Sequence, residues 1–94
     1  MYKLEITPSA HKFIKKLPKN IRQKIYEESY KILINPYVSE KLHGELRDCR
    51  SHNFRFRGVW YRVAYVVDEE KKKIVVVFAG TREGFYKRLQ HLIR

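Results

Sequence analysis

Hydrophobic and polar residues change their spacing several times along the chain, and each spacing is typical of one kind of element. Over residues 2–6, apolar and charged positions alternate, which predicts a β-strand. Over residues 10–17, apolar positions recur at helical intervals, which predicts an amphipathic helix. Thr7 and Pro8 precede that helix, and they favour a start with threonine as the cap and proline in the first turn.

Proline residues mark the limits of a second predicted helix. Pro18 cannot continue the first helix, but it is well placed to open the next one. Apolar residues then follow at helical spacing from Ile21 to Leu33, and Asn35-Pro36 stops the pattern. The two helices should therefore form a hairpin with a very short connection.

The second half of the chain predicts a sheet. A loop over residues 38–49 leads into three segments rich in β-branched and aromatic residues, separated by Gly58 and by a charged turn over residues 68–73. Strands joined by such short connections run antiparallel. These strands are expected over residues 53–57, 60–67 and 74–79.

A last helix is predicted over residues 83–93, after Gly80-Thr81 ends the sheet. The order of elements is then β-α-α-β-β-β-α, which is an α+β fold with one antiparallel sheet and the N-terminal helical hairpin on one face. A chain of 94 residues has room for a single domain, expected over residues 1–94.

The charge of the chain restricts its partners. Its 21 lysine and arginine residues and 10 acidic residues give a net charge of +11, which creates a strong positive field. Nucleic acid, an acidic protein or both are the expected partners. The amino terminus lacks the pattern of a signal peptide, no apolar run could span a bilayer, and the single cysteine, Cys49, suits a reducing compartment. We therefore expect a cytoplasmic protein that is not attached to a membrane.

The arginines of the predicted sheet are the strongest indication of function. Between Cys49 and Val67 there are four arginines, no lysine and no carboxylate, and aromatic residues are interleaved with the arginines. On a strand, this alternation places the rings toward the helices and the guanidinium groups on the opposite face, which we expect to lack helical cover. Guanidinium groups bind phosphate bidentately and stack on bases. The arginines expected to converge on this face are Arg55, Arg57, Arg62 and Arg82.

A purely structural role is the alternative for these arginines, since each could pair with Asp48, Glu83 or a carboxylate of a helix. Acidic residues are few and lie mostly elsewhere in the sequence, so we favour a shared surface that binds an anion. The histidines show no spacing typical of a metal site, and neither a metal nor another cofactor is expected.

Several short motifs occur in an order that is found in a known family. They are Leu17-Pro18-Lys19 between the helices, Lys41-Leu42-x-Gly44 in the loop, Phe54-Arg55-Phe56-Arg57 and Tyr61-Arg62-Val63-x-Tyr65 on the strands, and Gly80-Thr81-Arg82-Glu83 leading to Tyr86. With these motifs, the chain resembles the RelE/ParE toxin superfamily over essentially its whole length. Within that superfamily it is most similar to the RelE-like mRNA endonucleases, or mRNA interferases, of type II toxin–antitoxin systems.

The resemblance implies an activity and a set of partners. Relatives such as RelE cut mRNA in the ribosomal A site, and a partner antitoxin holds them inactive. This chain is thus expected to be a ribosome-dependent endoribonuclease, with the 70S ribosome, mRNA and a RelB-like antitoxin as partners. We expect the antitoxin to cover basic surface and to displace or block the C-terminal helix near Tyr86.

The resemblance also implies roles for individual residues. In the family, two basic residues alternate along the second strand, an arginine lies on the third, another follows the last strand, and a tyrosine lies in the C-terminal segment. By position, the implied catalytic residues are Arg55, Arg57, Arg62, Arg82 and Tyr86. A register shift in the hairpin would bring Asn53 into play in place of Arg57. Further contacts to RNA are expected from Arg50, Asn53, Lys87 and Arg88.

The implied reaction is a transphosphorylation. The ribose 2′-hydroxyl attacks the adjacent phosphodiester, which leaves a cyclic phosphate and a free 5′-hydroxyl. Arg62 and Arg82 would hold the phosphate, and Tyr86 would stack on a nucleobase. Tyr86 could instead pack in the core of the last helix.

The proton acceptor for this reaction is harder to identify. Some family members carry lysines where this chain has arginines, and arginine does not lose its proton. His52 and Glu83 are the candidate bases, although strand alternation places His52 on the face of Phe54 unless a bulge near Asn53 turns it. Cys49 is expected to be a packing residue and not a nucleophile.

Two other functions fit the same fold. A ParE-like toxin would bind DNA gyrase and cut nothing, and a catalytically weak relative would only bind RNA. The arginines together with Tyr86 favour the nuclease, because inhibition of gyrase needs no site that holds a phosphate.

Overall fold

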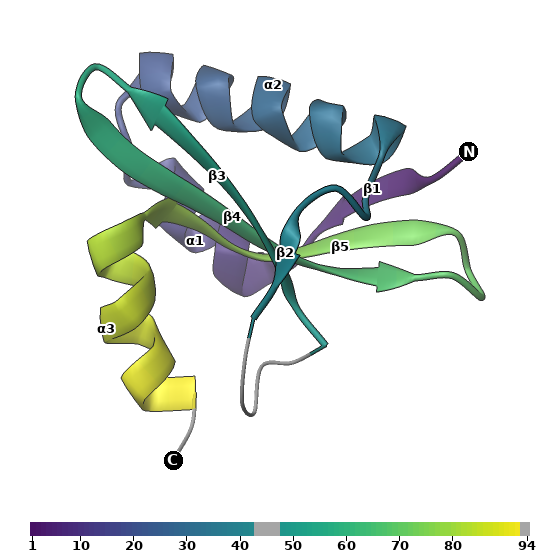
Figure 1. Cartoon of the computed structure of the whole chain (residues 1–94). Helices are drawn as coiled ribbons and strands as arrows, with labels where there is room; N and C mark the ends of the chain where they lie inside the picture. Colours follow the sequence, from purple (N-terminus) through teal and green to yellow (C-terminus); the bar gives the residue numbers. More distant parts are fainter. Residues whose placement is uncertain (43–47, 93–94) are drawn as a thin grey trace.

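The computed structural model describes residues 1–42 and 48–92, with side chains described as far as residue 88. Within this part of the chain, three helices pack on a five-stranded sheet with the strand order β1-β5-β4-β3-β2 (Figure 1). The elements are β1 (Lys3–Ile6), α1 (Pro8–Lys15), α2 (Lys19–Ile34), β2 (Glu40–Lys41), β3 (Arg50–Phe56), β4 (Val59–Asp68), β5 (Lys73–Thr81) and α3 (Arg82–Leu92). Gly44 of the loop motif and the predicted helix end at residue 93 lie outside the described residues.

The predicted helical hairpin is confirmed. The Thr7 side chain accepts a hydrogen bond from the Ala10 amide at 3.1 Å, and Pro8 occupies the first turn of α1. Pro18 directly precedes α2, and α2 ends before Pro36 because a residue that precedes proline is pushed out of the helical region. None of the helices in the described part of the chain is long and apolar enough to cross a membrane.

The prediction of one antiparallel sheet is correct for the strands from β2 to β5 but not for β1. Strand β1 pairs parallel with β5, with Lys3 opposite Lys73 and Ile6 opposite Val76. The two helices between β1 and the rest of the sheet make a connection long enough for a parallel return. The predicted loop also contains a short strand, β2, because Glu40 and Lys41 extend the antiparallel ladder beyond β3.

The two faces of the sheet bury different clusters. On the face of α1 and α2, the core contains Ile14, Ile25, Val63, Tyr65 and Val76, which are all almost fully buried. The opposite face carries the cluster of Ala64, Phe78 and Phe85, with Phe13 packed against it. This face was predicted to lack helical cover, and that prediction is wrong. Helix α3 lies on it, because the apolar side of α3, which includes Phe85, needs a partner (Figure 1).

The hairpin between β3 and β4 turns over only two residues. Phe56 pairs with Val59, and the residues between them, Arg57 and Gly58, have φ angles of 52° and 80°. Positive φ at both central positions is typical of the tight turn that matches the twist of the flanking strands. Strand β3 therefore ends at Phe56, and Arg57, which was predicted on the strand, belongs to the turn.

Candidate functional site

Strand register brings the central polar residues of the hairpin together. Asn53 lies opposite Arg62, and Arg55 lies opposite Trp60. Residues at a spacing of two share a face, so all four side chains belong to the face that carries α3. The ladder runs without a break from Arg50 to Phe56, so no bulge turns a side chain of β3 to the other face.

The guanidinium group of Arg62 is the centre of this face. Its Nε donates a hydrogen bond to Asn53 Oδ1 at 3.0 Å. Its central carbon lies 4.6 Å from the ring centroid of Phe85 and 5.2 Å from that of Tyr86. Only 7 % of Arg62 is exposed, so its charge is stabilised by an amide and two aromatic faces beneath α3.

Tyr86 joins Arg62 to a second arginine. The pKa of the Tyr86 phenol is lowered, first by hydrogen bonding from Arg62, then by the charge of Arg62, and further by Arg82. Both guanidinium groups thus favour the phenolate form. Tyr86 is 49 % exposed, so the alternative that it packs in the core does not hold.

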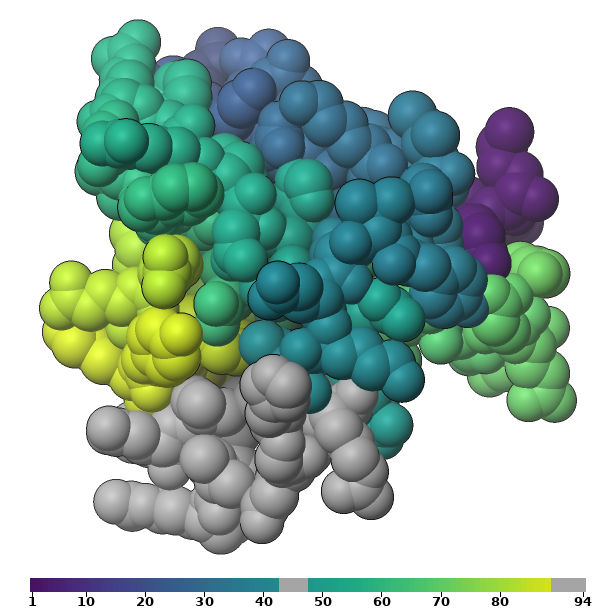
Figure 2. All heavy atoms as spheres, viewed as in Figure 1, coloured from purple at the N-terminus to yellow at the C-terminus, as the bar shows by residue number. Residues whose placement is uncertain are grey.

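A groove lies between the hairpin turn and the start of α3. Its volume is about 580 Å³, and Figure 2 shows the end of the hairpin directly beside α3. The large exposed ring of Trp60, with 45 % of its surface accessible, forms one wall. The groove is lined by Gly58, Val59, Trp60, Thr81, Arg82, Glu83 and Tyr86.

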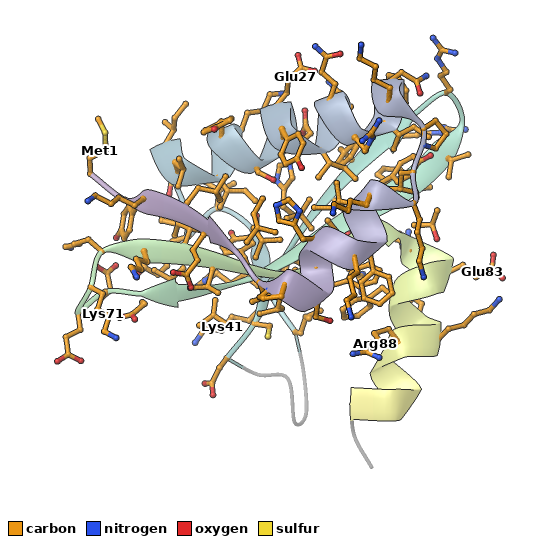
Figure 3. The ribbon with its side chains drawn as sticks, turned by 180° about the vertical axis from the view of Figure 1, so that it is seen from behind. Met1, Glu27, Lys41, Lys71, Glu83 and Arg88 are labelled. Carbon is orange, nitrogen blue, oxygen red and sulfur yellow. The ribbon has the colours of Figure 1, made fainter. Side chains whose placement is uncertain are left out.

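The arginines of this face remain uncompensated by acids. Within residues 1–42 and 48–88, Arg55, Arg62 and Arg82 form no ion pair with a carboxylate, and the acid nearest in sequence, Glu83, pairs with Lys87 at 3.6 Å. Glu83 points away from the body of the molecule (Figure 3). The alternative that each arginine is neutralised by its own acid is therefore not what the described residues show. The arginines of this face and the rings of Trp60 and Tyr86 form a positively charged, partly aromatic surface, which suits the binding of a phosphate next to a nucleobase.

The structure corrects the predicted position of Arg57. Its guanidinium group lies at the turn, 5.4 Å from the ring centroid of Phe56, and so it does not share the strand face of Arg55. The pair of alternating positions on that face is instead formed by Asn53 and Arg55. No shift of register occurs, because Asn53 lies on this face by regular alternation and the strand ends before Arg57.

Of the other residues that were predicted to contact RNA, Arg50 and Arg88 are engaged elsewhere, whereas Lys87 lies next to Glu83 of the groove. Arg50 points to the other side of the strand, where its Nη1 donates to the carbonyl of Ser39 at 2.6 Å. Arg88 lies 5.5 Å from the ring centroid of Phe13, and Figure 3 shows it directed away from Glu83 and toward α1. Lys87 is exposed on α3 beside Glu83.

His52 is held on the helix side of the sheet. Its Nε2 lies 2.8 Å from Oε1 of Glu28, a buried carboxylate of α2 that also pairs with Lys31 at 2.7 Å and Lys24 at 3.3 Å. Burial alone would raise the pKa of Glu28, but hydrogen bonds from Lys31, His52 and Lys24 lower it to about 2. His52 is therefore engaged in a structural ion-pair cluster and does not reach the arginine face.

Neither the cysteine nor a metal cluster adds to the site. Burial raises the pKa of the Cys49 thiol, which disfavours a thiolate nucleophile and agrees with the expected packing role. No group of three or more His, Cys, Asp or Glu side chains that could hold a metal ion occurs among the described residues.

Sequence reasoning missed two residues of the site. Trp60 borders the groove, and its position directly opposite Arg55 follows from the two-residue turn. Thr81 fixes the start of α3, because its Oγ1 accepts a hydrogen bond from the Gly84 amide at 2.9 Å. A threonine just before a predicted helix is a recognisable cap, and it could have been identified from the sequence.

Comparisons with known proteins place this site in a family. Residues 4–90 match the sequence model of the ParE-like toxin of type II bacterial toxin–antitoxin systems. The chain belongs to the ParE-like toxin family. An Escherichia coli protein described as a RelE-like toxin is 34 % identical to this toxin over 83 residues, which cover 87 % of this chain and 84 % of that protein.

Solved structures agree with this assignment. A mutant of the E. coli toxin RelE in its free state matches with a TM-score of 0.74 and 26 % identity, and the match covers 96 % of each chain. A chain of the RelBE2 toxin–antitoxin complex of Mycobacterium tuberculosis matches with a TM-score of 0.73 and 28 % identity, over 86 % of this toxin and 98 % of that chain. The predicted membership of the RelE/ParE superfamily and the α+β fold are therefore confirmed.

Proposed function

We propose that this toxin is a ribosome-dependent endoribonuclease that cleaves mRNA in the A site by transphosphorylation. The observation that carries the proposal is the grouping of Arg55, Arg62 and Arg82 with Tyr86 along one face and its groove, where none of the described carboxylates pairs with them. A surface of this kind stabilises an anion whose charge increases in the transition state. The RelE-like relatives support the same reaction.

The proposed roles follow from the position of each side chain. Arg62 and Arg82 hold the non-bridging oxygens of the scissile phosphate, and Arg55 binds the neighbouring backbone. Trp60 stacks on a nucleobase at the wall of the groove, a contact worth about 1–3 kcal/mol per base. The ribosome supplies the alignment of the strand that this small groove cannot provide alone.

Tyr86 is the proposed proton acceptor for the 2′-hydroxyl. Its phenol lies beside two guanidinium groups that lower its pKa, whereas His52 is bound to Glu28 on the other face of the sheet. A phenolate formed between Arg62 and Arg82 can take the proton while the same arginines stabilise the phosphorane. This role replaces the bases that were considered from the sequence.

Binding of RNA requires a rearrangement near α3. The rings of Phe85 and Tyr86 cover the guanidinium group of Arg62, and they leave only a small part of it exposed. We infer that α3 shifts far enough for the phosphate to reach Arg62, while the Tyr86 phenol stays beside Arg62 and Arg82. Such a step helps the toxin to distinguish its substrate from other RNA, because the site is completed only when the substrate is bound.

A RelB-like antitoxin is the proposed protein partner. One of the similar structures is a toxin–antitoxin complex, RelBE2 of M. tuberculosis, and the charge of +11 favours an acidic wrapping segment. We expect this segment to cover basic surface and to displace or block α3 near Tyr86. A complex that leaves both the arginine face and α3 open would contradict this part of the proposal.

Inhibition of DNA gyrase is the second candidate, because the matching family is named for ParE. Purified toxin added to translating 70S ribosomes, followed by mapping of mRNA ends, distinguishes the two functions. We expect cuts in the A site that are lost in Arg82→Ala. They should be retained in Lys15→Ala, a control that also removes one positive charge but at an exposed position of α1. Intact mRNA together with double-strand DNA breaks would favour gyrase, and RNA binding without cuts would indicate an inactive relative.

A further inference from the structure

The side-chain oxygen of Asn53 is the acceptor of two hydrogen bonds. Arg62 Nε donates to Asn53 Oδ1 at 3.0 Å, and the hydroxyl of Ser51 lies 3.1 Å from the same oxygen. Ser51 and Arg62 are both buried, whereas Asn53 is exposed. The three residues form a short chain from the interior of the sheet to the arginine face.

The chemistry of the donors fixes the orientation of the Asn53 amide. A guanidinium N–H can only donate, so the atom that faces Arg62 must be the carbonyl oxygen. The hydroxyl of Ser51 must then donate to that oxygen as well. Both bonds use the oxygen, and no described residue accepts a hydrogen bond from the amide nitrogen, so within this part of the chain its two donors can serve a ligand.

An amide is also electrically neutral, and this property distinguishes Asn53 from the usual partner of a buried arginine. A carboxylate at the same position would neutralise Arg62 and compete with a phosphate. The amide instead anchors Nε and leaves the positive charge uncompensated. The guanidinium plane is fixed on its other side by the rings of Phe85 and Tyr86, at 4.6 and 5.2 Å.

We propose that Asn53, held by Ser51, is a positioning residue that orients Arg62 for the substrate phosphate and preserves the charge of that arginine. The inference rests on the proposed ribonuclease function, and it adds a specific role for two uncharged residues. Asn53 acts through Arg62. Its amide nitrogen, which no described residue uses as a donor, is in addition placed to contact the backbone of a bound RNA.

The first test needs no RNA and therefore stands apart from the proposed function. In NMR spectra of the ¹⁵N-labelled toxin, the Nε–H of Arg62 should give a separate signal that exchanges slowly with water. Asn53→Ala should shift this signal and accelerate its exchange by more than about 10-fold, and Ser51→Ala should have a smaller effect in the same direction. An unchanged signal in both variants would overturn the positioning role, whether or not the toxin cleaves RNA.

The second test separates geometry from charge. Asn53→Asp keeps the size of the side chain and the oxygen that accepts from Arg62, but it adds a negative charge. If Asn53 had only a structural role, this variant would cleave mRNA on ribosomes at nearly the wild-type rate. We expect cleavage to fall on the order of 100-fold. Asn20→Asp, the same change at an exposed position of α2, should stay within about 2-fold. If the two variants behave alike, charge preservation by Asn53 is wrong.

Ser51→Ala completes the comparison, because it alters no charge. We expect cleavage to fall roughly 5- to 10-fold while the melting temperature shows that the toxin is folded. If the wild-type toxin cleaves mRNA and both Ser51→Ala and Asn53→Ala cleave it at the same rate, the inference is contradicted and the proposed function stays intact. If the wild type itself does not cleave mRNA, the proposed function fails, and affinity for a short single-stranded RNA then compares the variants. Equal affinity of Asn53→Asp and Asn20→Asp for that RNA would overturn the inference.

Discussion

The guanidinium group of Arg62 lies 4.6 Å from the ring centroid of Phe85, and this contact joins strand β4 to helix α3. Phe85 is also packed edge-on against Phe78 of β5, at a centroid distance of 5.3 Å. The phenyl ring of Phe85 therefore packs in the core and at the same time contacts the guanidinium group of Arg62. The stability of α3 and the accessibility of Arg62 should consequently depend on each other.

Removal of this ring tests the relationship. Phe85 is only 3 % exposed, so Phe85→Ala should lower the free energy of unfolding by about 3 kcal/mol. The loss should be measured by urea unfolding, with Val59→Ala as an exposed apolar control. Exchange of the Arg62 Nε–H should accelerate in the same variant. Loss of stability without any change at Arg62 would show that the two functions of the ring are separate.

The proposed base predicts a pH dependence. Arg62 and Arg82 lower the pKa of Tyr86 below its usual value of 10.0, so the phenolate fraction grows as pH rises and reaches one half at a lower pH than for a free tyrosine. Cleavage under single-turnover conditions should rise in the same way and then level off. Tyr86→Phe keeps the ring but should abolish the rise. The same pH profile in both proteins would exclude Tyr86 as the proton acceptor.

The position of Arg57 in the turn predicts unequal effects of two neighbouring arginines. Arg55 lies opposite Trp60 on the arginine face, whereas Arg57 belongs to the turn. Arg55→Ala should reduce cleavage roughly 10- to 100-fold, and Arg57→Ala should reduce it by a markedly smaller factor. Circular dichroism and melting temperature serve as folding controls. An equal or larger loss in Arg57→Ala would favour the arrangement expected from simple strand alternation.

Acid sensitivity should arise far from the arginine face. The pKa of Glu28 falls from 4.5 to about 2 on folding, so its contribution to stability is present above pH 4.5 and is lost as pH falls toward 2. A shift of this size corresponds to on the order of 3 kcal/mol. Glu28→Gln should lower stability at pH 7 and flatten its dependence on pH in this range. A pH profile of unfolding identical to wild type would show that Glu28 does not carry this dependence.

Local signals in the sequence were sufficient for the helical hairpin. Thr7, Pro8, Pro18 and Pro36 each restrict the backbone whatever surrounds them, so the limits of α1 and α2 follow directly. The position of α3 could not be predicted in this way. Its apolar residues require a partner surface, but only the folded sheet decides which face offers one.

The site was predictable in composition but not in detail. Arg55 and Arg62 lie on one face of the sheet, and Arg62 and Arg82 both act on Tyr86, but the catalytic roles that the family resemblance implied for these residues stay predictions. Arg57 left that face because the hairpin closes with two residues of positive φ, a choice that sequence alternation does not reveal. The role of Asn53 was hidden for another reason. The sequence indicated Asn53 only as an RNA contact, because a neutral residue gives no charge pattern, and its bond to Arg62 is visible only in the structure.

The chemistry of the RNA ends tests the central claim most directly. Translating ribosomes should be programmed with an mRNA that carries one 2′-deoxynucleotide on the 5′ side of the mapped A-site cut. The unmodified mRNA should yield a 2′,3′-cyclic phosphate and a 5′-hydroxyl, and the deoxy substitution should abolish the cut. Cleavage of the modified mRNA at the same bond, or products with a 5′-phosphate, would contradict the account.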